Sequence, residues 1–124
     1  MFMLKSNDLI NKVKLYNKFL NPETLSKAYD FAVKAHEKQK RDEGSPYIIH
    51  PVAVANILTE LKLDSATIAT GLLHDTIEDT YATYENIKNE FGKEVADLVD
   101  GVTKISVFEN QAKTNSKAEN FRKL

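Results

Sequence analysis

The sequence predicts an all-α domain, and three observations support this fold class. Apolar residues recur at intervals of three and four along most of the chain, which is the spacing of one helix face. No segment shows the alternation of apolar and polar residues that is typical of a β-strand. The breaks between the apolar stripes carry helix start signals, such as Asn21 followed by Pro22 and Glu23. A chain of 124 residues is expected to form one domain, residues 1–124.

The first two helices are predicted on either side of Asn21. The stripe before it consists of Leu9, Val13, Tyr16 and Leu20. The longer stripe after it consists of Leu25, Ala28, Tyr29, Ala32 and His36. The polar segment that follows, EKQKRDEGSPY at residues 37–47, predicts a loop because Gly44 and Pro46 interrupt helices.

A third helix is predicted after His50. The residue before a proline disfavours helical backbone, so we expect His50, which precedes Pro51, to lie in extended backbone just outside this helix. The residues expected to face inward from the helix are Val54, Ile57, Leu58 and Leu61. Asp64 is a suitable N-cap for a fourth helix, which contains the stretch LLHDTIEDT at residues 72–80.

Two further helices and a less regular tail complete the prediction. Tyr84, Ile87 and Phe91 mark a short helix that ends near Gly92. The next helix carries Val95, Leu98, Val99 and Val102. The pattern then loosens over residues 106–117, where a loop is predicted, and residues 118–124 are expected to begin a last helix.

The composition excludes several classes of function. Seventeen basic and eighteen acidic side chains nearly cancel, so no overall electrostatic attraction to nucleic acid or to a membrane surface is expected. The chain has no cysteine, which excludes disulfides, thiolate metal sites and a cysteine nucleophile and is compatible with a cytoplasmic protein. No apolar run has the length of a signal peptide core or the about 20 residues of a membrane span.

The stretch LLHDTIEDT concentrates ionisable groups on one side of the fourth helix. At about 100° per residue, an apolar side is formed by Ala66, Ala69, Leu73 and Ile77. The opposite side carries His74, Asp75, Glu78 and Asp79. A solvated helix surface is the simpler interpretation of such a cluster. A binding site is favoured instead because the cluster follows two leucines and has no basic residue at i+4 to offset the repulsion.

A divalent cation would offset the negative charge of this cluster. Neutral imidazole together with carboxylate suits Mn²⁺, Fe²⁺ or Zn²⁺ better than Ca²⁺. His74 and Asp75 cannot complete a coordination shell alone, and His50 is the best-placed third ligand. His36, by contrast, lies on an apolar stripe and is predicted to be a packed core residue.

Several ordered segments resemble the hydrolase domain of the RelA/SpoT family, from about Leu9 to the final residue. They are GSPYIIHPVAVANIL, DSATIATGLLHDTIEDT, FGKEVADLVDGVTKIS and KAENFRKL. The resemblance implies an all-α helical bundle of the HD-domain phosphohydrolase type. It also implies metal-dependent hydrolysis of the 3′-pyrophosphate of the guanine nucleotide (p)ppGpp, giving GDP or GTP and pyrophosphate, with Mn²⁺ as the usual metal.

The resemblance also assigns roles to individual residues. By position, His50, His74 and Asp75 match three metal ligands of the family. Glu78 and Asp79 match the acidic pair that orients and activates the attacking water. A metal lowers the pKa of bound water and a nearby carboxylate can take its proton, so these roles agree with the chemistry of the residues.

The loop before the third helix supplies the predicted substrate-binding residues. Arg41 matches a basic position beside the substrate, and Lys40 shares that role. Tyr47 is expected to pack the loop or to line the nucleotide pocket. The long members of the family have a second basic residue and a serine after this arginine, whereas Asp42 and Glu43 stand here, as in the short hydrolases.

The resemblance further predicts a C-terminally truncated domain. In the family, the helix that begins AENFRK continues into a segment like KLADRLHNMRT, which completes the metal shell and contacts the substrate. This chain stops at Leu124, so we expect an incomplete shell and exposed apolar surface that favours self-association or a complementing chain. The alternatives are an inactive remnant or nucleotide-binding module, and a phosphohydrolase for another nucleotide, which the match around PYIIHP and HDTIEDT disfavours.

Overall fold

The computed structural model describes residues 3–41 and 43–105 of the chain. These residues form helices and connecting loops without a β-strand, apart from an isolated β-bridge between Lys40 and Pro46. The predicted all-α fold class is therefore confirmed. The loop and the last helix that were predicted for residues 106–124 lie outside the described residues.

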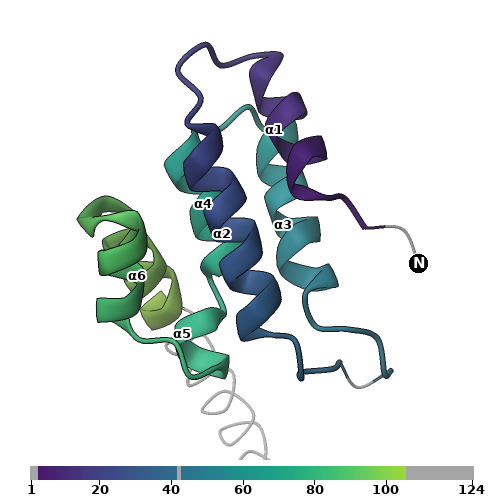
Figure 1. Ribbon diagram of the computed structural model, residues 1–124, viewed down its shortest axis with the longest axis vertical. Coiled ribbons are helices and arrows are strands. Elements are labelled where there is room, and N and C mark those ends of the chain that lie inside the picture. Colours follow the sequence, from purple (N-terminus) through teal and green to yellow (C-terminus); the bar gives the residue numbers. More distant parts are fainter. Residues whose placement is uncertain (1–2, 42, 106–124) are drawn as a thin grey trace, which may run out of the picture.

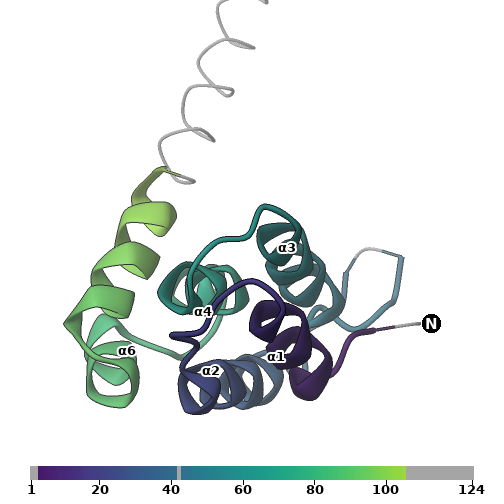
Figure 2. The same cartoon turned by 90° about the horizontal axis from the view of Figure 1, so that it is seen from above.

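Four helices form the bundle that holds most of the core (Figure 1). They are α1 (Ser6–Lys14), α2 (Pro22–Ala35), α3 (Ile49–Glu60) and α4 (Ser65–Leu73). Helix α4 lies at the centre and packs against α2 and α3, and α1 packs against α2 and α3 from the other side (Figure 2). Because α4 is surrounded in this way, every residue from Ile68 to Leu73 is buried.

The N-caps of α2 and α4 agree with the sequence prediction. The Asn21 side chain accepts a hydrogen bond from the Thr24 backbone N–H at 3.2 Å, and Pro22 occupies the first helical position. The Asp64 carboxylate accepts one from the Thr67 backbone N–H at 2.9 Å. Hydrogen bonds from Thr67 lower the pKa of Asp64 below its usual value.

Replacing Asp64 by alanine is expected to destabilise the protein by about 1 kcal/mol at neutral pH, because an N-terminal N–H of α4 loses its acceptor. The folded-state pKa of Asp64 is lowered, so its stabilisation is present above the unfolded pKa near 3.8 and is lost as the pH falls through the folded pKa. Urea unfolding at neutral and acidic pH measures both effects. Asp64→Asn, which keeps a capping oxygen, should stay close to the wild type at neutral pH.

Helix α3 begins earlier than predicted. Its first residue is Ile49, so His50 lies inside the first turn, and the prediction of extended backbone outside the helix was wrong. Pro51 is tolerated there because the first N–H groups of a helix have no intrahelical acceptor to lose. His50 is thereby held on a helix, not on a loop.

The inward face of α3 also differs from the prediction. Ile57 and Leu61 are 57% and 63% exposed, whereas Val52, Ala55 and Thr59 are buried. The contact with α4 decides this face. A Cβ atom on Gly71 would lie 2.5 Å from Leu58 Cδ1 and 3.6 Å from Ala55 Cα, so the two helices approach closely because small residues face each other.

The stretch LLHDTIEDT was predicted to lie in one continuous helix, and this prediction was wrong. Helix α4 ends at Leu73, a turn contains His74 and Asp75, and the single-turn helix α5 (Thr76–Asp79) follows. Two carbonyl oxygens at the end of α4 have side-chain hydrogen-bond partners. Thr76 Oγ1 donates to Leu73 O at 2.8 Å, and His74 Nδ1 lies 2.6 Å from Gly71 O. The Asp79 backbone N–H still donates to Asp75 O at 2.9 Å, so Asp79 lies one helical turn after Asp75 despite the break.

The remaining described residues pack beside the bundle. Helix α6 (Tyr84–Phe91) ends at Gly92, whose positive φ of 91° suits glycine, and residues 93–105 are helical again (Figures 1 and 2). In that last stretch Val95 and Val99 are buried, whereas Leu98, Val102 and Ile105 are 40%, 37% and 67% exposed. Self-association through such apolar surface stays a prediction.

Helix α1 ends earlier than the first apolar stripe predicted. Leu9 and Val13 are buried in α1, but α1 ends at Lys14, so Tyr16 and Leu20 lie beyond it while still packing against the core. The Tyr16 hydroxyl donates to Leu63 O at 2.6 Å. Within the two described ranges, no helix combines the length and the apolar character needed to cross a membrane.

Candidate metal centre

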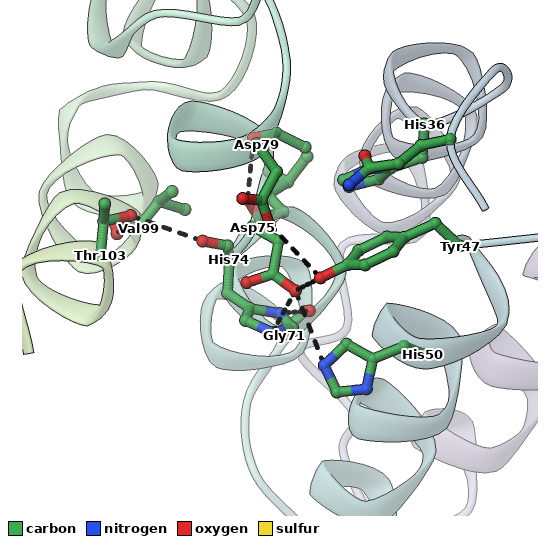
Figure 3. A network of polar contacts seen from close by, with 12 residues as sticks. His36, Tyr47, His50, Gly71, His74, Asp75, Asp79, Val99 and Thr103 are labelled. Atoms are coloured by element: carbon green, nitrogen blue, oxygen red, sulfur yellow. Dashed lines mark hydrogen bonds and ion pairs between the residues drawn. The ribbon is translucent and has the colours of Figure 1, made fainter. Parts of the chain in front are cut away.

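His74 is anchored at the end of the central helix. Its Nδ1 atom donates to the Gly71 carbonyl oxygen, which leaves Nε2 directed at the Asp75 carboxylate, 3.0 Å from Oδ2 (Figure 3). A histidine ligand usually has one ring nitrogen fixed in this way while the other faces the metal. The Thr103 hydroxyl lies 3.4 Å from the His74 carbonyl oxygen, so residues 93–105 support the same turn.

His50 approaches the same carboxylate from α3. Its Nε2 atom lies 3.6 Å from Asp75 Oδ2, and its ring centroid lies 5.4 Å from that of His74. The three residues each offer a ligand atom, and these atoms all lie within 4.8 Å of one another. Two imidazole nitrogens and one carboxylate fit a first-row divalent cation, so the predicted ligands His50, His74 and Asp75 are positioned to bind a metal.

Burial and hydrogen bonding favour the cation-binding forms of His50 and Asp75, whereas at His74 a cation competes with a proton. Burial lowers the pKa of His50 and outweighs the opposite effect of Asp75, so the ring stays neutral. Burial acts to raise the pKa of Asp75, but hydrogen bonds from His74 and Tyr47 outweigh it and the pKa is lowered. His74 has a raised pKa because its bonds to Asp75 and Gly71 outweigh burial, so a cation must displace its Nε2 proton.

Tyr47 contacts the same cluster from the loop between α2 and α3. Its hydroxyl donates to Asp75 Oδ2 at 2.7 Å and lies 3.3 Å from Asp79 Oδ2 (Figure 3). Burial first, and then the hydrogen bond to Asp75, raise the pKa of Tyr47, so the hydroxyl keeps its proton. Sequence reasoning missed these contacts. The spacing of Tyr47 three residues before His50, in PYIIHP, is the signal that could have placed the two side chains near one site.

A cleft of about 410 Å³ opens beside the cluster. It is lined by Gln39, Lys40, Arg41, Glu43, Tyr47, His50 and Asp79. The structure thus brings the three predicted substrate-binding residues to the edge of the metal centre. Glu43, at one of the positions that depart from the long family members, lies 3.6 Å from the Arg41 guanidinium.

The two predicted catalytic acids occupy different positions. Asp79 lines the cleft, and its backbone N–H donates to Asp75 O at 2.9 Å, which fixes α5 relative to the ligand. Glu78 is exposed and is absent from the lining of the cleft. The geometry therefore places Asp79 closer to the ligands' cleft than Glu78.

The model of the HD domain family matches residues 28–124 of this sequence. The chain belongs to the HD domain family. The solved structure described as a metazoan orthologue of SpoT that hydrolyses ppGpp superposes on this HD domain with a TM-score of 0.63. The two are 30% identical, and the match covers 70% of this chain and 51% of that one.

Bacterial relatives are similar to this HD domain over most of its length. It is 56% identical over 103 residues to a GTP pyrophosphokinase of Myxococcus xanthus and 54% identical over 100 residues to the bifunctional (p)ppGpp synthase/hydrolase SpoT of Escherichia coli K12. Each match covers 81% of this chain and 14% of the relative. Identity to the GTP pyrophosphokinase rsh of Brucella melitensis is 47% over 122 residues, which are 98% of this chain and 16% of that one. The resemblance to the RelA/SpoT family is thus confirmed, and the chain spans about a seventh of these relatives.

Three further ionisable residues of the HD domain, His36, Asp97 and Asp100, lie outside the ligand group. His36 is 1% exposed, as predicted for a core residue, with Nδ1 2.8 Å from Gln39 Oε1 and no hydrogen-bond partner for Nε2. Asp97 binds Lys93 and Tyr84, and Asp100 pairs with Lys104. Among residues 3–41 and 43–105, the group that could hold a metal consists of the three predicted ligands.

Proposed function

We propose that this chain is a metal-dependent phosphohydrolase domain that removes the 3′-pyrophosphate from (p)ppGpp, with Mn²⁺ as the metal. The observation that carries the proposal is the convergence of His50, His74 and Asp75 beside a cleft that Arg41 and Lys40 border. The names of the relatives supply the substrate, since the Escherichia coli protein is called a (p)ppGpp synthase/hydrolase and the metazoan protein is described as hydrolysing ppGpp.

The metal would be held by the Nε2 atoms of His50 and His74 and by the carboxylate of Asp75. A bound divalent cation lowers the pKa of water and offsets negative charge on phosphoryl oxygens. Three protein ligands leave coordination positions for water and substrate, as catalytic sites require.

The residues around the cleft would bind the nucleotide and handle the proton. The Arg41 guanidinium and the Lys40 ammonium attract phosphate oxygens, and a guanidinium can also stack on a base. Water attacks the phosphorus that is bonded to the 3′ oxygen, and the bond from this phosphorus to the 3′ oxygen breaks. The 3′ oxygen takes up a proton and becomes the hydroxyl of GDP or GTP, and the phosphoryl groups depart as pyrophosphate. The Asp79 carboxylate borders the cleft and would take the proton of the attacking water. Glu78, the other acid of the predicted pair, lies outside the lining of the cleft, and its role in orienting the water rests on the family resemblance alone.

A nucleotide-binding domain without turnover is the second candidate function. It is favoured by the ligand count, because the described residues supply three ligands from one cluster and the family pattern has a further carboxylate. Such a domain would bind the nucleotide in the cleft through Arg41 and Lys40 while releasing no pyrophosphate.

Metal binding and hydrolysis measured on one preparation distinguish these functions. The chain purified with Mn²⁺ is expected to retain metal and to release pyrophosphate from ppGpp, and His74→Ala is expected to lose both. Retained nucleotide binding without pyrophosphate release by the wild type would favour the binding domain. Release of phosphate or pyrophosphate from GTP at the same rate as from ppGpp would contradict the proposed substrate.

A further inference from the structure

Tyr47 joins parts of the site that come from separate elements (Figure 3). Its hydroxyl lies within hydrogen-bonding distance of Asp75, in the turn after α4, and of Asp79, at the end of α5. Its ring lies 4.8 Å from that of His36, next to the end of α2, and 5.9 Å from that of His50 on α3.

We propose that Tyr47 is a positioning residue, whose hydroxyl holds the metal-binding carboxylate of Asp75 and the carboxylate of Asp79 in a fixed arrangement. Two carboxylates that face one point repel each other, and a donor between them offsets this repulsion. The 2.7 Å bond to Asp75 leaves that carboxylate directed at the two imidazoles. The effect on Asp75 stands on geometry alone, whereas the catalytic consequence for Asp79 rests on the proposed function.

The Tyr47 ring is itself held from two directions. Its backbone N–H donates to the Gln39 carbonyl oxygen at 3.0 Å, which fixes the loop beside the end of α2. Behind the ring lies the buried His36 imidazole, which is oriented by its contact with Gln39 Oε1. A hydroxyl on a ring that is packed in this way loses little further conformational entropy when metal binds.

Two other tyrosines, Tyr16 and Tyr29, have hydroxyls that bind backbone and not carboxylate oxygens. The hydroxyls of Tyr16 and Tyr29 donate to backbone carbonyl oxygens, those of Leu63 and Leu4, at 2.6 and 2.7 Å. These bonds join segments of the chain that include none of the three ligands. Tyr29→Phe is therefore a matched control, because it removes the same single oxygen from a tyrosine with an equally short hydrogen bond.

The test compares Mn²⁺ affinity of the full chain with and without the Tyr47 hydroxyl, by isothermal titration calorimetry in the absence of nucleotide. Tyr47→Phe is expected to weaken Mn²⁺ binding by about 10–100-fold, the range for loss of a group that orients a ligand, while Tyr29→Phe binds as the wild type does. In ppGpp hydrolysis at saturating Mn²⁺, kcat should fall with little change in KM.

Three results would overturn the proposal. The first is Mn²⁺ affinity of Tyr47→Phe within twofold of the wild type. The second is a raised KM at unchanged Mn²⁺ affinity, which would place the hydroxyl on the substrate. The third is a wild-type chain that binds neither Mn²⁺, Co²⁺ nor Zn²⁺, since no metal-binding carboxylate would then need positioning. Metal binding by the wild type without pyrophosphate release would instead refute the proposed function and leave the assignment for Asp75 standing.

The support from behind the ring can be tested separately. His36→Leu leaves every ligand and the Tyr47 hydroxyl in place but removes the imidazole that packs on the ring. We expect Mn²⁺ affinity between those of the wild type and Tyr47→Phe, with retained helical circular dichroism. Affinity equal to that of the wild type would overturn the role of His36 in fixing Tyr47.

Discussion

Asp75→Asn is expected to lower Mn²⁺ affinity more than the about 10–100-fold that loss of a supporting group costs, and to abolish pyrophosphate release. Asp75 is the one carboxylate in the group of three ligands, and Oδ2 lies 3.0 and 3.6 Å from the two imidazoles. Asparagine has nearly the same shape and can still accept the Tyr47 hydrogen bond. The change therefore removes charge and leaves the packing intact. Metal content after dialysis and calorimetric titration measure the effect.

Asp97→Asn is the matched control for this variant. Asp97 also accepts a hydrogen bond from a tyrosine, Tyr84, at 2.5 Å, but it lies outside the ligand group. It should keep both metal affinity and hydrolysis. Equal losses in the two variants would mean that net charge, and not coordination, governs Mn²⁺ binding, and would contradict the assignment of the metal centre.

The ligand residues could be predicted from sequence although their local structure could not. His74 and Asp75 were placed on a continuous helix face, and His50 in extended backbone, yet the three side chains converge. His74 and Asp75 keep backbone dihedrals of the right-handed helical region in the turn after α4. The angle between their side chains is therefore close to that in a helix, and the prediction that both reach one ion did not depend on a continuous helix. Asp79 follows Asp75 by one helical turn, as predicted, and borders the cleft.

The role of the Tyr47 hydroxyl depends on contacts that periodicity does not encode. Tyr47 lies in a loop, 28 residues before its acceptor Asp75, and no local pattern specifies that pairing. The interior face of α3 was mispredicted for a related reason. α3 has apolar residues on more than one side, and the buried side is the one where Ala55 meets Gly71 of α4, a contact fixed only by the tertiary fold.

The packing of α3 on α4 can be tested by comparing a buried isoleucine of α4, Ile68, with Ile57 of α3, which the sequence pattern wrongly turned inward. Ile68→Ala is expected to destabilise the protein by about 2–5 kcal/mol, because Ile68 is completely buried in the central helix and its removal leaves a cavity. For a small domain with a total stability of about 5–15 kcal/mol this is a large fraction. Urea unfolding of the metal-free chain, followed by circular dichroism, measures the loss.

Ile57→Ala makes the same chemical change on α3 and should cost less than about 1 kcal/mol. Ile57 is 57% exposed, so little apolar surface is lost from the core, and the higher helix propensity of alanine offsets part of that loss. The original sequence pattern, which turned Ile57 inward, predicts comparable losses for both variants. Comparable losses would therefore contradict the packing of α3 on α4, and with it the register that brings His50 to the metal centre.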